Sequence, residues 1–324
     1  MPFHPDSLPD LTGKVFIVTG GNSGIGYHTV AHLAVHGAHV YMCSRSAEKG
    51  TAAIANIQKS HPSSSTSSAA GILNISLLQM DLTELASVVA AAKRFLTLET
   101  SLHGLINNAG IMATPLEITK DGHEAQWQTN YLAHWVLTEH LLPIMLRTAK
   151  ALPSGGDSVR IVNVTSSGHL GAPKGGIEFA DPSLSSIGPW QRYGQSKLAN
   201  ILHTRTLHKR YGPSSDNGRI WVAAVHPGLV ETNLASAVNE SFMLKIFSAG
   251  RKVGLMWPAE KGSWNSLFFA ASREMKPEQS GGYHEIFGRF GEPWWQSAAS
   301  KDEKLADKLE EWTREVMTRE GWVP

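Results

Sequence analysis

The sequence predicts an α/β fold with a doubly wound, mostly parallel sheet, and three observations lead to it. Short apolar runs rich in β-branched residues alternate with segments of helical length along most of the chain. A glycine cluster at residues 19–26 stands between the first apolar run and the first helical segment. The 324 residues are 42% hydrophobic and 18% charged, enough for one large core. Strands that alternate with helices pack as a parallel sheet covered on both faces, with ligands at the carboxyl ends of the strands.

In the first half of the chain, the expected strands and helices alternate strictly. Each strand is a short apolar run bounded by polar or glycine residues, as buried parallel strands are. The elements are, in order, a strand over Lys14–Thr19, a helix from Ile25, a strand over Ala38–Cys43, a helix over Ala47–Lys59, a strand over Ile75–Met80, a helix over Leu85–Leu98 and a strand that ends with Leu105–Asn107.

The second half continues the alternation with longer helices. The expected elements are a helix over Ala125–Met145, a strand over Val159–Val164, a helix over Gln191–Tyr211, a strand over Arg219–Val225 and a C-terminal helix over Asp302–Met317. Three segments look like insertions: the serine-rich His61–Gly71, expected to be a surface loop, and Ser167–Pro189 and Glu231–Trp257. The last two follow the fifth and sixth strands, so they would flank a site at the strand ends.

The whole chain, residues 1–324, is expected to form a single domain. Its core would cover residues 14–270, and residues 271–324 would be a C-terminal extension. No role follows from the sequence for the tail after Gly281, which carries Trp294 and Trp295.

Charge and composition exclude several classes of protein. The 29 basic and 28 acidic residues are mixed along the chain and give a net charge of +1, so no face for nucleic acid or anionic lipid is expected. The single Cys43 excludes an intramolecular disulfide and a cysteine-rich metal cluster. Met1–Asp10 lacks the apolar run of a signal peptide, and no apolar stretch is long enough to span a membrane, so a cytoplasmic protein is expected.

A metal site is not expected, although the chain has 15 histidines. His28 and His32 have the spacing of a helical ligand pair, but no acidic partners support them. A solvated or packing role suits these two side chains better.

The glycine cluster has the form of a dinucleotide fingerprint. It follows an expected strand and opens an expected helix, where glycines let the chain turn sharply and let a pyrophosphate approach the backbone. The helix N-terminus would supply N–H donors and a positive dipole to the phosphates. A glycine turn without any ligand is the alternative. The cofactor-binding candidates in this turn are Gly20, Asn22, Ser23, Gly24, Ile25 and Gly26.

The ends of the next three strands add candidates for a bound nucleotide. After the third strand, Asp81 could accept a hydrogen bond from an adenine amino group, with Leu82 beside it. The end of the second strand has no acidic residue to hold the ribose 2′-hydroxyl of NAD, and Arg45 offers a guanidinium for a 2′-phosphate instead. NADP is therefore preferred to NAD, with a solvated surface arginine as the alternative. After the fourth strand, small and amide residues could line the cofactor: Asn108, Ala109 and Gly110.

A tyrosine and a lysine four residues apart provide the chemistry. Tyr193 and Lys197 would project from one face of a helix, and an ammonium beside a phenol favours phenolate and lowers the phenol pKa from about 10. Without the glycine cluster, an exposed helical pair would be the better interpretation. The fifth strand runs into Thr165-Ser166-Ser167, which places a hydroxyl at the same crevice.

These motifs, taken in order, resemble those of the short-chain dehydrogenase/reductases. The resemblance covers about residues 14–270. It rests on T-G-G-N-S-G-I-G, the D-L pair, N-N-A-G, the serine strand end, Y-G-Q-S-K and the H-P-G of His226 to Gly228. It implies a Rossmann-like fold in which Ser166 polarises a substrate carbonyl and Tyr193 is the acid/base. Lys197 would bind the nicotinamide ribose and lower the pKa of Tyr193.

Further positions are carried over from the same family. Asn130, in Q-T-N-Y-L-A-H-W, matches a helix asparagine that holds a water in the proton relay, and Ser167 is the alternative to Ser166. Weaker transfers to the cofactor side are Pro227, Gly228, Val230 and Thr232. S-R-S-A-E-K-G and S-K-L-A-N-I-L resemble the extended group of retinol-dehydrogenase-like and WW-domain-oxidoreductase-like enzymes.

The sequence thus predicts an NADP(H)-dependent enzyme that reduces a hydrophobic ketone or aldehyde to an alcohol, or the reverse. Apolar residues of the two variable segments would form the substrate cleft: Phe179, Trp190, Leu229, Leu234, Phe242, Met243, Phe247, Met256 and Trp257. An imine reduction, a templated isomerisation or cyclisation, and a non-catalytic NADP-binding sensor stay open as alternatives. Family members often pair through the helices that carry Asn130 and Tyr193, so a homodimer is open too, although the tail could cover that surface.

Overall fold

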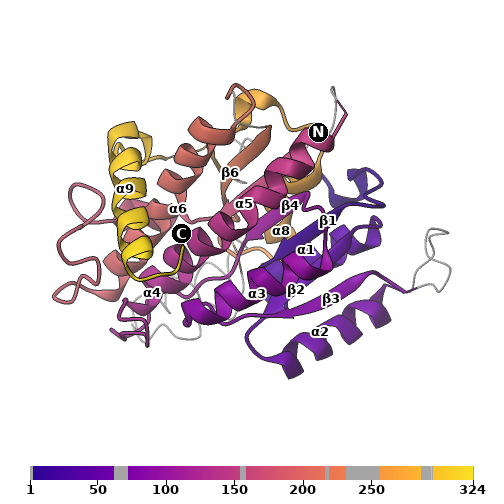
Figure 1. Cartoon of the computed structure of the whole chain (residues 1–324), viewed down its shortest axis with the longest axis horizontal. Helices are drawn as coiled ribbons and strands as arrows, with labels where there is room; N and C mark the ends of the chain where they lie inside the picture. Colours follow the sequence, from indigo (N-terminus) through magenta and orange to yellow (C-terminus); the bar gives the residue numbers. More distant parts are fainter. Residues whose placement is uncertain are drawn as a thin grey trace.

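Seven strands form one parallel sheet in the order β3-β2-β1-β4-β5-β6-β7 (Figure 1). The computed structural model describes residues 3–61, 72–153, 158–215, 219–230, 256–285, 293 and 295–323. The strands are β1 (Val15–Val18), β2 (His39–Ser44), β3 (Ile75–Gln79), β4 (Gly104–Asn107), β5 (Val159–Val164), β6 (Ile220–His226) and β7 (Tyr283–Glu285). Because β1 pairs with both β2 and β4, the winding reverses there and a crevice opens at the strand ends. The fold class predicted from the sequence is confirmed.

Helices cover both faces of the sheet (Figure 1). One face carries α1 (Gly24–Val35), α2 (Ala47–Ser60) and α8 (Ala259–Ala271), and the other carries α3 (Leu85–Leu98), α5 (Ala133–Ala151) and α6 (Pro189–Tyr211). A short α4 (Ala125–Trp127) precedes α5, and α9 (Glu303–Arg319) ends the described chain. The 3-10 segments are η1 (Pro5–Ser7), η3 (Ser167–Gly171), η5 (Pro277–Gln279) and η6 (Ala299–Lys301).

Strand β1 shows why these apolar runs form buried strands. Its side chains alternate between the two cores: Val15 and Ile17 pack with α3 and α5, whereas Phe16 and Val18 pack with α1 and α8. Since both faces are buried, the run is continuously apolar instead of alternating with polar residues. The first residue after the strand, Thr19, is also fully buried, so the chain enters the glycine turn from inside the core.

The structure differs from the sequence prediction in a few elements. The single helix expected over Ala125–Met145 is interrupted by the π-helical segment η2 (Gln128–Leu132) and continues to Ala151. Helix α8 and strand β7 were not expected, and β7 extends the sheet beyond residue 270. Most of the expected loop His61–Gly71 and of the insertion Glu231–Trp257, with Thr232, lies outside the described residues. Of the helices in the described ranges, none has the length and apolar character that crossing a membrane requires.

Helix α9 fastens the tail across α5 and α6 (Figure 1). Its Glu310 is buried and accepts hydrogen bonds from the Trp135 indole at 2.9 Å and from Arg314 at 2.7 Å, and it pairs with Arg210 at 2.9 Å. Burial by itself would raise the pKa of Glu310, but the surrounding positive charges and these donors leave the pKa lowered. The carboxylate is therefore ionised and shared by three elements.

Removal of this carboxylate should destabilise the fold. Glu310→Ala leaves a buried indole N–H without its acceptor and removes the carboxylate that pairs with Arg210, while Arg314 keeps Glu139 at 2.9 Å. We therefore expect the free energy of unfolding to fall by about 2–4 kcal/mol. Urea unfolding measures the change. Glu311→Ala, at the exposed next residue, should stay within about 0.5 kcal/mol of the parent. Equal effects of the two substitutions would contradict the importance of the buried contact.

Candidate active site

A cavity of about 540 Å³ opens where β1, β4, β5 and β6 end. Its wall is built from the segments that follow these strands, the first turn of α1 and one face of α6. The structure brings together most of the candidates from the sequence at this cavity: Gly20, Ser23, Gly24, Ile25, Asn108, Ala109, Gly110, Ser166, Ser167, Tyr193, Lys197, Pro227, Gly228 and Val230. Asn22, Gly26, Arg45, Asp81, Leu82 and Asn130 do not line it.

The glycine turn is shaped so that its backbone faces the cavity. Gly20 and Gly24 have φ angles of 63° and 54°, which side chains rarely adopt. A Cβ on Gly26 would lie 2.4 Å from the Gly20 carbonyl oxygen, so helix and turn pack backbone to backbone. Ser23 is the N-cap of α1, but its hydroxyl makes no capping hydrogen bond. The first N–H groups of α1 therefore keep their donor capacity for an anion at the helix N-terminus.

The segment after β4 is fastened to the glycine turn by one threonine. The Thr19 hydroxyl accepts the backbone N–H of Asn108 at 2.8 Å and that of Ala109 at 2.9 Å. The Asn108 amide donates to the Thr19 carbonyl at 2.8 Å. Thr19 belongs to the glycine motif but was not among the predicted site residues; the sequence signal for it is a hydroxyl on the last residue before the glycines.

Arg45 and Asp81 lie side by side at the ends of β2 and β3. The guanidinium Nε is 4.0 Å from a carboxylate oxygen of Asp81, and the Arg45 side chain is 73% exposed. The other oxygen of Asp81 accepts the backbone N–H and the hydroxyl of Thr83, at 2.9 and 2.7 Å. Arg45 is therefore free to reorient toward an anion near the strand ends, while Asp81 is held in place.

Tyr193, Lys197 and Ser166 meet at the inner end of the cavity. Tyr193 and Lys197 are 4% and 3% exposed, so α6 presents both to the interior. The Lys197 ammonium donates to the carbonyl of Val164, the last residue of β5, at 3.0 Å and lies 5.7 Å from the centre of the Tyr193 ring. The Ser166 hydroxyl is hydrogen-bonded to Tyr193 and accepts the Gly168 N–H at 3.0 Å.

Burial controls the protonation of both groups. It raises the pKa of the Tyr193 phenol to about 12, although the hydrogen bond with Ser166 works in the opposite direction. Burial likewise lowers the pKa of the Lys197 ammonium to about 8. The lowered phenol pKa expected from the spacing of the two residues is thus wrong for this arrangement. At neutral pH the phenol keeps its proton and can donate it, and Lys197 is still mostly charged.

Two glycines that sequence analysis missed bring the serine turn against α6. A Cβ on Gly168 would lie 2.8 Å from a ring carbon of Tyr193, and one on Gly194 would lie 2.7 Å from backbone atoms of Gly171 and Ala172. The turn is further held by His169, whose ring donates to the Ser166 carbonyl at 2.8 Å. The only sequence signal was the glycine-rich character of the segment after the fifth strand.

The Asn130 side chain does not line the cavity but binds two other segments of the protein together. Its amide donates to the Ile111 carbonyl and to the Ser196 hydroxyl, both at 2.9 Å, and its oxygen accepts the Ile111 N–H at 2.8 Å. Gly110 lies between it and Lys197: a Cβ on Gly110 would be 3.0 Å from the Asn130 amide oxygen and 3.3 Å from the ammonium. Asn130 thus holds the chain beside Lys197.

Part of the expected apolar cleft is present. Trp190 and Leu229 line the cavity, together with Met112. Phe179 does not: its ring packs against Trp312 of α9 at 6.1 Å, because the tail covers this part of the insertion. Met256 and Trp257 do not line it either. Leu234, Phe242, Met243 and Phe247 lie outside the described residues.

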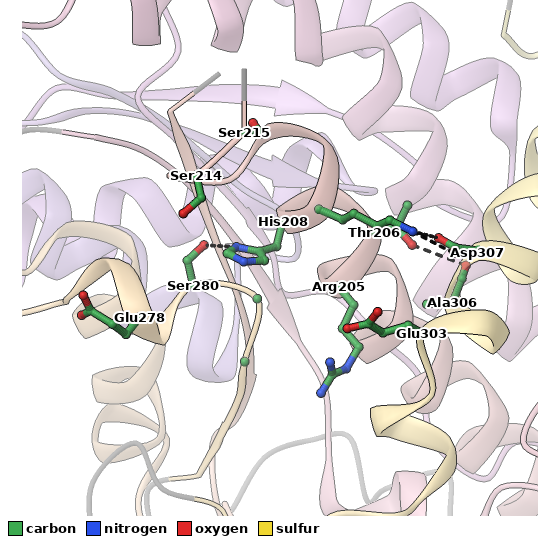
Figure 2. Close-up of a pocket in the computed structure, with 13 residues that line it drawn as sticks. Arg205, Thr206, His208, Ser214, Ser215, Glu278, Ser280, Glu303, Ala306 and Asp307 are labelled. Carbon is green, nitrogen blue, oxygen red and sulfur yellow. Dashed lines mark hydrogen bonds and ion pairs between the residues drawn. The ribbon is translucent and has the colours of Figure 1, made fainter. Parts of the chain in front are cut away.

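A second cavity, of about 550 Å³, lies beside the C-terminal half of α6, between α9 and the segment before β7 (Figure 2). Several of its polar groups bind other parts of the chain. Lys209 pairs with Asp307 at 2.8 Å, and the His208 ring bonds the Ser280 hydroxyl at 2.9 Å. These contacts hold the tail, so this cavity has a structural explanation. Within the described ranges, no cluster of three metal-ligating side chains occurs.

Comparison with known proteins identifies the family. A family model described as short chain dehydrogenase matches residues 14–180. Short-chain dehydrogenase/reductase drtF from Aspergillus calidoustus is 49% identical over 98% of both chains. Retinol dehydrogenase 12 from Mus musculus is 34% identical over 92% of this chain and 84% of its own, which confirms the likeness to that group.

Solved structures share the fold. A crystal structure of an uncharacterized protein from Mycobacterium Paratuberculosis aligns with a TM-score of 0.73, at 29% identity, over 98% of both chains. NADPH-bound carbonyl reductase from chicken fatty liver aligns with a TM-score of 0.59 over 86% of this chain and 99% of its own, where 22% identity supports the fold alone. The matched family model and the close relatives establish that the chain belongs to the short-chain dehydrogenase/reductase family of oxidoreductases, which use a nicotinamide cofactor.

Proposed function

We propose that this protein is an NADP(H)-dependent oxidoreductase that reduces a hydrophobic ketone or aldehyde to an alcohol, or runs the reverse reaction. The observation that carries the proposal is the junction of three groups in one cavity: the Ser166 hydroxyl, the buried phenol of Tyr193 and the ammonium of Lys197. A protein that only binds the cofactor does not need all three, so the non-catalytic sensor is the weaker alternative.

The residues of the turn after β1 suit a dinucleotide. Gly20 and Gly24 leave no side chain between the backbone and the cavity, Gly26 lets α1 pack closely on the turn, and the N-terminus of α1 offers N–H donors to a pyrophosphate. Asp81 and Leu82 would face the adenine, and Asn22 and Arg45 would lie near the ribose phosphate. Asn108 to Gly110 and the segment with Pro227, Gly228, Val230 and Thr232 would border the nicotinamide half.

The chemistry of the chain's own side chains follows from their protonation. The bound cofactor supplies or accepts a hydride. The hydroxyls of Ser166 and Tyr193 lie next to each other at the cavity, so one carbonyl oxygen placed between them would accept from both in place of their mutual hydrogen bond. Tyr193, with a pKa of about 12, holds its proton until the oxygen gains negative charge and then donates it. Lys197 spends one N–H on Val164 and keeps two for the cavity, where its charge favours the phenolate that Tyr193 becomes.

The apolar part of the wall supports a hydrophobic substrate. Met112, Trp190 and Leu229 line the same cavity as the polar groups, and the likeness to retinol dehydrogenase 12 supports a lipid-like alcohol or its aldehyde as the substrate class. Imine reduction and templated isomerisation or cyclisation need the same cofactor and stay as alternatives. We place the enzyme in the cytoplasm. Pairing through α5 and α6 would require α9 to move, since α9 packs on both, so a homodimer stays a prediction.

Substitution of the phenol tests the chemistry. Tyr193→Phe removes the proton donor and leaves the glycine turn untouched, so kcat should fall by about 10²–10⁴-fold while NADPH affinity changes less than about threefold. NADPH absorbance with a panel of ketones, aldehydes, imines and alcohols gives kcat, and fluorescence titration gives the affinity. Tyr211→Phe, at the end of the same helix, should keep full activity. Full activity in Tyr193→Phe would refute the proposed function.

A charge change at Arg45 tests the choice of cofactor. Arg45→Asp removes the guanidinium and adds a carboxylate that can accept from a ribose 2′-hydroxyl, so we expect KM for NADPH to rise by about 10–100-fold and KM for NADH to fall. Lys49→Asp makes the same change of charge one turn into α2 and should alter KM only a few-fold. If the ratio of the two KM values stays the same in Arg45→Asp, Arg45 does not bind the phosphate.

The buried ammonium should lower stability. Burial holds the folded-state pKa of Lys197 at about 8, below its ordinary 10.5, so the folded state is penalised wherever the ammonium is charged. At pH 7 this amounts to about 3 kcal/mol, less about 1 kcal/mol for the hydrogen bond to Val164. Lys197→Met should therefore abolish turnover and raise the free energy of unfolding at pH 7 by about 2 kcal/mol.

The stability difference between Lys197→Met and the wild type should depend on pH in one direction. The wild-type penalty disappears as pH rises from 8 to 10.5, because the folded state loses the proton there while the unfolded state keeps it. The advantage of Lys197→Met should shrink over that range in urea unfolding at pH 7 and pH 10. Lys93→Met, at an exposed position of α3, should show no such trend. A stability difference that does not vary with pH would contradict the buried-charge explanation.

A further inference from the structure

A buried histidine joins two parts of the site that the mechanism uses separately. His134, in the first turn of α5, is 3% exposed. Its Nδ1 lies 3.1 Å from the main-chain oxygen of Asn130 in the π-helical segment, and its Nε2 lies 2.9 Å from the hydroxyl of Thr19 at the end of β1. The side chain therefore spans from the segment beside Lys197 to the entrance of the glycine turn.

The donor and the acceptor of each hydrogen bond between Asn130, His134 and Thr19 can be assigned from their chemistry. The Asn130 carbonyl can only accept, so Nδ1 of His134 carries the hydrogen. Burial lowers the pKa of His134 to about 4, so the ring is neutral and Nε2 has a free lone pair. The two lone pairs of the Thr19 hydroxyl accept the N–H groups of Asn108 and Ala109, so its hydrogen is free to donate. Nε2 at 2.9 Å is a better acceptor for it than the Ile106 carbonyl at 3.5 Å, so the hydroxyl donates to the ring.

One end of this hydrogen-bond network lies at the cavity, and the other lies next to Lys197, which lines the cavity. At one end, Asn108 and Ala109 line it on the side of the glycine turn. At the other, Asn130 holds Ile111 by two hydrogen bonds and Ser196 by one, and Ser196 precedes Lys197 on α6. A shift of the Asn130 main chain would move the side chain that holds Ile111 and Ser196 beside the ammonium. A shift of Thr19 would move the segment after β4.

We propose that His134 is a positioning residue that couples the cofactor side of the cavity, through Thr19, to the proton-transfer side, through Asn130. The inference rests on the proposed function. It goes beyond it because His134 touches neither the cavity nor the groups that react there: it acts by fixing two main-chain segments relative to each other with a single neutral ring.

Two amide substitutions separate the two arms of the ring. The amide nitrogen of Asn can take the place of Nδ1, so His134→Asn keeps the bond to Asn130 and loses the one to Thr19. The amide oxygen of Gln can take the place of Nε2, so His134→Gln keeps Thr19 and loses Asn130. We expect His134→Asn to raise the Kd of NADPH about fivefold with kcat nearly unchanged. We expect His134→Gln to lower kcat about tenfold or more with Kd nearly unchanged, because small displacements of reacting groups cost much rate.

The experiment uses the full chain, with NADPH binding by fluorescence titration and turnover measured separately. His140→Asn and His140→Gln are the controls, because His140 on the same helix bonds the Trp322 carbonyl, away from the cavity. They should leave both constants within about twofold. Parallel losses of Kd, kcat and melting temperature in the two His134 variants would mean a merely structural role and would overturn the proposal, as would no change in either variant.

Nitrogen-15 NMR of the histidine rings in the free protein tests the same two hydrogen bonds of His134 without cofactor or turnover. The His134 signal, identified by its loss in His134→Gln, should report a neutral ring with hydrogen on Nδ1. Hydrogen on Nε2, or a charged ring at pH 7, would overturn the proposed positioning role of His134. The two proposals can fail separately. If the wild-type protein shows the expected tautomer and His134→Asn loses NADPH affinity as expected, but no carbonyl compound is reduced, the proposed function is refuted and the positioning role of His134 is supported.

Discussion

The ammonium of Lys197 sits in the interior of the fold, and the active cavity depends on where it is held. Its hydrogen bond to the Val164 carbonyl joins the end of β5 to the middle of α6. An ammonium is costly to bury, and here the cost appears as a pKa of about 8. The surrounding structure has to be stable enough to hold the charge in place. The phenol of Tyr193 shares this burial, so both groups enter the reaction already dehydrated and at fixed positions.

Rigid backbone contacts, more than side-chain contacts, fix the cavity around this charge. At one side Gly20 and Gly26 bring the glycine turn and α1 together, and at the other Gly168 and Gly194 bring the serine turn onto α6. In both places a single methyl group would meet backbone atoms or the Tyr193 ring. A site made in this way tolerates little displacement, which suits hydride transfer, where reacting atoms must be close and aligned.

The sequence predicted the strand ends well because parallel strands deliver their last residues to one edge whatever the loops do. Ser166 and the glycine turn reach the cavity for that reason, and Tyr193 and Lys197 join them because four-residue spacing puts both side chains on one face of α6. The π-helical segment was not predictable, because the residues around Asn130 have the same apolar periodicity as an ordinary helix. The predicted lowering of the Tyr193 pKa was wrong because the spacing of two residues shows which groups are neighbours but not how deeply they are buried. Strand β7 was missed because three residues carry little pattern, and pairing with β6 decides their conformation.

The tail shows how a segment without a motif can support the chemistry. Helix α9 adds Ala306, Leu309, Val316 and Met317 to the core that contains α5 and α6, and Glu310 ties the three helices by charge. These contacts lie on the outer side of α6, opposite the cavity that Tyr193 and Lys197 line. Because α6 packs between the tail and the sheet, any tilt that exposed its buried ammonium to water would have to break contacts on both sides of the helix. The stability that a buried charge removes from the site is supplied in part by apolar packing at the other face of the same helix.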